Sequence, residues 1–219
     1  MTNCFWITGL SSAGKTTLSH RLVNYLRSKG KITILLDGDE LRDALSDKDY
    51  NREARLEAAL RYSRICSLIV KQQINVVIGV IGLFNEVHQW NRQNIPGYIE
   101  VFVDVPMEEL KKRDPKNLYK KAEKGQINNV YGVDQYAEYP KNPDVHLLWS
   151  PGKSVENMME DLLSKIILIK QKEITKHSWL LKLLLIMVPT IMLKQQQRQQ
   201  RQQQQRQQPQ RIITISAQR

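Results

Sequence analysis

The chain has 219 residues, 41% of them hydrophobic, and a formal net charge of +11, which suits one domain with an appended segment. Residues 165–219 hold eleven Lys and Arg against one acidic residue, whereas residues 1–164 hold twenty-two against twenty-one. This distribution excludes a basic surface spread over the whole chain, so we expect that no nucleic acid is required for function.

The two cysteines and the first residues of the sequence favour a reducing, cytoplasmic location. Cys4 and Cys66 fall within predicted core elements, which argues against a disulfide framework and is typical of reducing conditions. No basic stretch followed by an apolar one precedes the first predicted strand. We therefore expect no secretory signal and a cytoplasmic location.

Short apolar runs alternate with helical patterns along the chain. We predict strands at 5–8, 32–36, 76–81, 101–105 and 145–149, and helices at 15–28, 52–72, 107–113 and 155–171. Runs that are apolar throughout indicate a parallel sheet covered on both faces. The predicted fold class is therefore α/β, with three layers and a mostly parallel five-stranded sheet. Such sheets bind ligands beyond the carboxyl ends of their strands.

The junction of the first strand and helix, WITGLSSAGKTTL (6–18), carries a phosphate-binding motif. Gly9, Gly14, Lys15 and Thr16 match G-x-x-x-x-G-K-[ST] at every fixed position. In such loops backbone N–H groups surround phosphate oxygens, the lysine reaches the β- and γ-phosphates, and the hydroxyl binds Mg²⁺. The predicted nucleotide-binding residues here are Gly9, Leu10, Ser11, Ser12, Ala13, Gly14, Lys15, Thr16 and Thr17.

Two aspartates follow the second predicted strand, in LLDGDELRDAL (35–45). Alone, they would indicate a solvated Asp-Gly turn. Beside a phosphate loop, we favour a catalytic interpretation, because carboxylates there can hold Mg²⁺ or accept a proton from a hydroxyl nucleophile. We expect Asp39 to receive the proton, Asp37 to support metal or water together with Thr16, and Lys15 to act on the donor phosphates.

Three later segments depart from the strand–helix alternation. Residues 114–140 are polar and too long for a simple connection, so we predict a lid. The apolar segment within 173–194 contains Lys182 and Pro189 and is shorter than the ~20 residues of a spanning helix, which disfavours membrane association. Residues 195–219 begin with a Gln/Arg-rich tract that we expect to be disordered. The nucleotide-binding domain is predicted to span 1–172.

Four stretches resemble the adenylyl-sulfate kinases: GLSSAGKTT (9–17), LLDGDELR (35–42), VFVDVPMEELKKRDPKNLYKKAEKGQ (101–126) and YGVD (131–134). The resemblance covers about residues 4–162, and RDPKNLYKKA is its most specific part. It implies a P-loop kinase fold with a mobile lid, and a homodimer. It also implies transfer of the γ-phosphoryl group of Mg²⁺-ATP to the 3′-hydroxyl of adenylyl sulfate, in sulfate assimilation.

The same resemblance implies roles for residues outside the loop. Arg42 and Arg55 match arginines that contact the acceptor nucleotide, and Tyr50 could supply an aromatic face for it. Arg113 matches the arginine that packs against the ATP base. Three lid lysines would bring positive charge over the closed site: Lys116, Lys120 and Lys121.

The acceptor side departs from the family pattern. The helix pattern D-R-x-E-N-I-R-R is replaced by ARLEAALR (54–61), Gly82 stands where a serine is typical, and Val130 replaces a phenylalanine that packs on the acceptor adenine. The stretch 84–103 resembles a branch found in bacterial surface-polysaccharide clusters, in which one member type phosphorylates cytidine diphosphoramidate on a ribose hydroxyl. We favour adenylyl sulfate as acceptor because it is the acceptor of the broader family, and we keep another nucleotide, such as cytidine diphosphoramidate, as the alternative.

A P-loop switch that hydrolyses nucleotide without transferring phosphate is the third interpretation. It is disfavoured because no N-K-x-D guanine-reading motif follows the later strands and because a switch would have no use for the lid.

Overall fold

A computed structural model describes residues 2–172, 174–175 and 178. The chain divides into two compact units, Met1–Ile167 and Leu168–Arg219. The predicted apolar segment 173–194 lies outside the described residues except at 174, 175 and 178, and the predicted tail lies outside them entirely. Within the described part, no helix combines the length and apolar character needed to cross a membrane.

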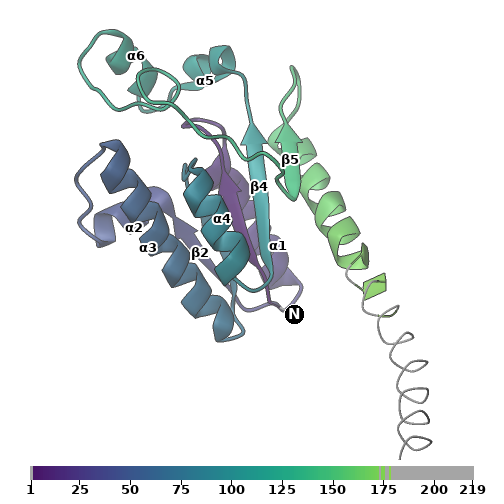
Figure 1. Cartoon of the computed structure of the whole chain (residues 1–219). Coiled ribbons are helices and arrows are strands. Elements are labelled where there is room, and N and C mark those ends of the chain that lie inside the picture. Colours follow the sequence, from purple (N-terminus) through teal and green to yellow (C-terminus); the bar gives the residue numbers. More distant parts are fainter. Residues whose placement is uncertain (1, 173, 176–177, 179–219) are drawn as a thin grey trace, which may run out of the picture. The chain divides into compact units, whose positions relative to one another are not determined.

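Five parallel strands form the centre of the first unit (Figure 1). They are β1 (Cys4–Thr8), β2 (Thr33–Asp37), β3 (Asn75–Gly79), β4 (Tyr98–Asp104) and β5 (Val145–Leu148), in the order β2-β3-β1-β4-β5. Every neighbouring pair is parallel. The predicted fold class is confirmed, with each of the five strands found within a few residues of its predicted position.

The helices cover both faces of this sheet. They are α1 (Lys15–Ser28), α2 (Gly38–Ala44), α3 (Arg52–Lys71), α4 (Asn85–Asn94), α5 (Met107–Arg113) and α6 (Leu118–Glu123), followed by a helical stretch at 155–167. In Figure 1, α1 lies on one face, while α3 and α4 lie on the other. The sequence prediction missed α2, α4 and α6. The first and last are only seven and six residues long, and α4 offers only Val87 and Trp90 as apolar residues.

Coverage of the sheet differs between its centre and its edges. All residues of β1 and β3 are buried. In β5, Val145 and Leu147 are buried, whereas His146 and Leu148 are exposed, and most of β2 is only half-buried. The sheet therefore has helices on both faces, as predicted, and its edge strands are less completely buried than its centre.

The glycine at position 82 is explained by packing against β1. Gly82 has φ of +43°, and a Cβ there would lie 3.0 Å from Cζ2 of Trp6. The Trp6 side chain is fully buried, so its ring cannot move aside. A serine at this position would meet the same obstacle, which gives a physical reason for one departure from the family pattern.

Gly82→Ala is expected to lower the free energy of unfolding by about 2–3 kcal/mol, because left-handed backbone strain and the contact with Trp6 act together. The control is Gly125→Ala, where φ is +64° but nothing lies within 4 Å of the added Cβ. Chemical denaturation of both variants separates the two effects. Equal losses in the two variants would contradict the proposed contact with Trp6.

Candidate active site

The phosphate-loop residues predicted from the sequence form the turn between β1 and α1. Gly14 immediately precedes α1, and Ser12 adopts a positive φ of 64°. The Lys15 Nζ atom donates a hydrogen bond of 2.8 Å to the carbonyl of Leu10, at the start of the turn. The ammonium group therefore lies within the loop, where N–H groups and the helix N-terminus together favour an anion.

A missing side chain on β3 lets α1 pack closely against that strand. Gly79 ends β3 opposite Asp37, and a Cβ on Gly79 would lie 2.9 Å from Oγ of Ser19 on α1. In the first turn of α1, Thr16 donates a hydrogen bond of 2.9 Å from Oγ1 to Oδ2 of Asp37. This contact joins the phosphate loop to the end of a strand that is not adjacent to β1.

The two predicted catalytic aspartates are linked at the start of α2. Oδ1 of Asp37 accepts a hydrogen bond of 2.9 Å from the backbone N–H of Asp39, so that Asp37 is the N-cap of this helix. The carboxylate of Asp39 is exposed and pairs with Nζ of Lys116 from the lid. Asp39 and Lys116 come from positions 77 residues apart, and the fold brings them together.

The charge state of Lys15 depends on its surroundings. Burial lowers the pKa of the Lys15 ammonium to about 8, although the carboxylates of Asp39 and Asp37 oppose the shift. For Lys116, in contrast, the bond to Asp39 raises the pKa. The pKa values of these two lysines are therefore shifted in opposite directions, that of Lys15 downward and that of Lys116 upward.

The oxygen atoms of Thr16 and Asp37 fit a magnesium ion that is shared with phosphates. A hydroxyl and a carboxylate meet there at 2.9 Å, and both are hard oxygen ligands. Among the described residues no group of three or more His, Cys, Asp or Glu side chains could hold a metal. Mg²⁺ usually takes one or two protein oxygens and completes its shell with substrate phosphates and water, so this small ligand set matches that type of site.

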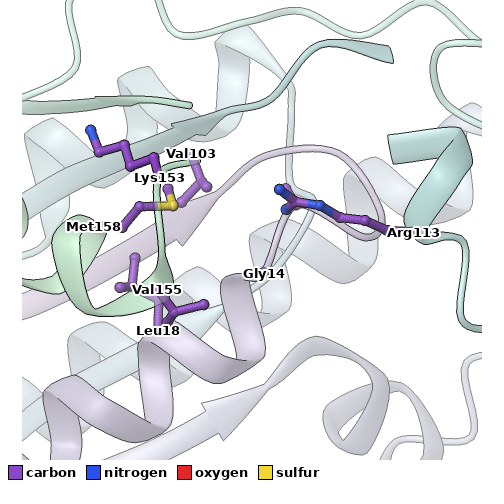
Figure 2. Close-up of a pocket in the computed structure, with 8 residues that line it drawn as sticks. Gly14, Leu18, Val103, Arg113, Lys153, Val155 and Met158 are labelled. Atoms are coloured by element: carbon purple, nitrogen blue, oxygen red, sulfur yellow. The ribbon is translucent and has the colours of Figure 1, made fainter. Parts of the chain in front are cut away.

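A cavity lies beside the phosphate loop, and Arg113 is among the residues that line it (Figure 2). Arg113 extends from the end of α5 toward the loop at Gly14, and Val155 and Met158 supply apolar surface. The Arg113 guanidinium lies over the ring of Trp149, 5.4 Å from its centroid, and its Nε donates to Glu109. Arg113 is therefore held at the cavity, and its packing against the ATP base stays a prediction.

The predicted acceptor residues cluster around Tyr50. The guanidinium groups of Arg42 and Arg55 lie 4.5 and 5.0 Å from the centroid of the Tyr50 ring. Arg55 also donates to the backbone carbonyls of Tyr50 and Asn129, at 2.8 and 2.7 Å. The structure thus brings these three residues together beside an open groove that is lined by α2, the loop 46–50 and Lys116.

The predicted lid contains ordered elements as well as loop. Lys116 reaches Asp39, whereas Lys120 and Lys121 lie on α6 with exposed side chains. That Lys120 and Lys121 bring positive charge over the closed site therefore stays a prediction. Sequence reasoning did not single out Trp149 or Tyr119, whose hydroxyl donates to the carbonyl of Ser11 at 3.0 Å. Tyr119 lies within RDPKNLYKKA, the stretch that resembles the family most specifically, and this resemblance could have pointed to Tyr119.

Comparisons with known proteins identify relatives of this chain. The sequence model of the family described as adenylylsulphate kinase matches residues 1–148. An adenylyl-sulfate kinase of Aeromonas salmonicida is 41% identical over 165 residues, covering 74% of this chain and 83% of the relative. A cytidine diphosphoramidate kinase of Campylobacter jejuni is 36% identical over 163 residues, covering 74% and 95%.

A solved structure of the Mycobacterium tuberculosis APS kinase CysC in complex with AMPPNP and APS has a TM-score of 0.70 and 31% identity. It covers 75% of this chain and 97% of that one. Family match, relatives and fold agree that the chain is a phosphotransferase with an alcohol group as acceptor. It belongs to the adenylylsulphate kinase family.

Proposed function

We propose that this chain transfers the γ-phosphoryl group of ATP to the 3′-hydroxyl of a nucleotide ribose, with adenylyl sulfate as the acceptor. The product would be 3′-phosphoadenylyl sulfate, which serves sulfate assimilation. The observation that carries the proposal is the convergence of Lys15, Thr16, Asp37 and Asp39 where β1 and β2 end. A donor phosphate held by the loop would face a carboxylate that can receive the acceptor's proton.

The proposed chemistry is an in-line displacement. Asp39 accepts the proton of the ribose hydroxyl, the hydroxyl oxygen bonds to the γ-phosphorus, and the bond to the β-phosphate oxygen breaks to release ADP. Lys15 neutralises charge that develops on the donor phosphates. Thr16 and Asp37 would hold Mg²⁺, which supplies further neutralisation when bound. Because the transition state is loose, positioning and charge account for most of the catalysis.

Cytidine diphosphoramidate is a second candidate acceptor, favoured by the geometry of the acceptor side. Val130 is 3% exposed and offers no aromatic face. The guanidinium groups of Arg42 and Arg55 lie against the ring of Tyr50, where an acceptor base would otherwise stack. An acceptor purine would thus lose stacking partners, and the relative named for cytidine diphosphoramidate shows that this family includes such an activity.

An acceptor panel tests the proposal. Purified full-length chain is incubated with ATP, Mg²⁺ and either adenylyl sulfate or cytidine diphosphoramidate, and products are identified by mass spectrometry. We expect a mass increase of one phosphoryl group on adenylyl sulfate. Phosphorylation of cytidine diphosphoramidate alone would overturn the first choice in favour of the second. ATP hydrolysis that is independent of either acceptor would contradict both and support a nucleotide switch.

A further inference from the structure

Tyr119 connects the lid to the middle of the phosphate loop. Its hydroxyl donates a hydrogen bond of 3.0 Å to the carbonyl oxygen of Ser11, a residue 108 positions earlier. Tyr119 is 1% exposed and Ser11 is half-buried, so the bond is partly shielded from water, and its loss costs free energy. A contact of this kind constrains the backbone of the loop more than an exposed bond would.

The lid helix that carries Tyr119 is itself anchored. The carboxylate of Asp114 accepts hydrogen bonds from the backbone N–H groups of Leu118 and Lys120, at 2.7 and 3.1 Å. Asp114 is 5% exposed, and its own N–H donates to the carbonyl of Leu110, which is fully buried in α5. These hydrogen bonds therefore hold the backbone of Tyr119, and with it α6, at a fixed position relative to α5.

The bond to Ser11 acts on the next residue through the peptide unit. In a planar trans peptide, the carbonyl of Ser11 and the N–H of Ser12 point in opposite directions. Ser12 has φ of 64°, a conformation that costs free energy for a residue other than glycine. A flip of this peptide unit would move that φ to the extended region and turn the N–H away. Tyr119 holds the carbonyl against such a flip.

We propose that Tyr119 is a positioning residue that keeps the Ser12 N–H directed into the phosphate loop, where it can bind a donor phosphate. The inference rests on the proposed ATP binding at this loop. It also means that donor affinity depends on the position of the lid, because the same hydrogen bond joins α6 and the loop. Tyr119 would act through the loop backbone, without touching the acceptor.

The test is Tyr119→Phe in the full-length chain, which keeps the ring and removes the hydroxyl. We expect the affinity for a nonhydrolysable ATP analogue, measured by calorimetry, to fall about fivefold, as for the loss of one hydrogen bond. The KM for the acceptor should stay unchanged, since the bond touches only the donor side. The matched control is Tyr136→Phe in the same lid, at a tyrosine that is 85% exposed, and it should bind ATP like the wild type.

Two results with the Tyr119→Phe variant would contradict the role of Tyr119. Equal ATP affinity in a folded Tyr119→Phe variant and the wild type would overturn the inference, and so would equal increases in the KM values for ATP and acceptor. A wild-type chain that does not bind the ATP analogue would instead contradict the proposed function. If the variant does not fold, amide hydrogen exchange of the wild type provides the test. We expect the amides of residues 11–14 and of α6 to exchange in one common opening event. Opening of α6 independently of residues 11–14 would overturn the inference.

Discussion

Replacing Lys15 with alanine is expected to lower kcat/KM for ATP roughly 10³-fold, the effect of removing one preorganised charge from a phosphoryl-transfer site. The ammonium group lies within the loop and donates to the carbonyl of Leu10, and donor phosphates would replace that carbonyl as its partner. Steady-state kinetics with either candidate acceptor measure the loss. Lys31→Ala, at an exposed lysine beyond the other end of α1, should leave activity unchanged. Undiminished turnover in Lys15→Ala would contradict the site.

The lowered pKa of Lys15 gives the same prediction a pH dependence. Phosphate binding favours the charged ammonium, whose pKa in the free protein is about 8. Below that pH, ATP affinity should be constant. Above it, affinity should fall by roughly tenfold for each pH unit, because binding must then take up a proton. Lys15→Arg should remove this dependence, since a guanidinium stays charged throughout the range, and a slope that persists in Lys15→Arg would assign it to another group.

Asp39→Asn is expected to lower kcat roughly 10²- to 10⁴-fold, the usual contribution of a general base. The amide keeps the size of the side chain and cannot accept the acceptor's proton. Its ATP affinity should stay close to that of the wild type, because Lys15 and the loop amides bind the donor. Single-turnover kinetics with a saturating acceptor would separate the chemical step from binding.

Glu40→Gln is the matched control for Asp39, because Glu40 is the next residue of α2 and is exposed. It loses the same charge one position away and should retain kcat. If both variants lose the same activity, the effect is electrostatic and Asp39 does not act as the proton acceptor.

Much of the fold follows from local pattern. The apolar runs of β1 and β3 and the periodicity of α1 and α3 are strong because these elements are buried against the centre of the sheet. Where burial is partial, the signal weakens: β2 and β5 are edge strands with half-exposed residues, and α4 is polar except at Val87 and Trp90. The boundaries of these elements, and the existence of α4, depend on contacts that a linear pattern does not record.

Residue types at fixed spacing were enough to predict the family, the phosphate loop and the parallel α/β fold. Which distant side chains meet could be seen only once the chain was folded. Thr16 bonds to Asp37, Lys116 pairs with Asp39, and Tyr119 bonds to Ser11. Such contacts join residues far apart in the chain, so they are set by the order of the strands and the packing of the lid.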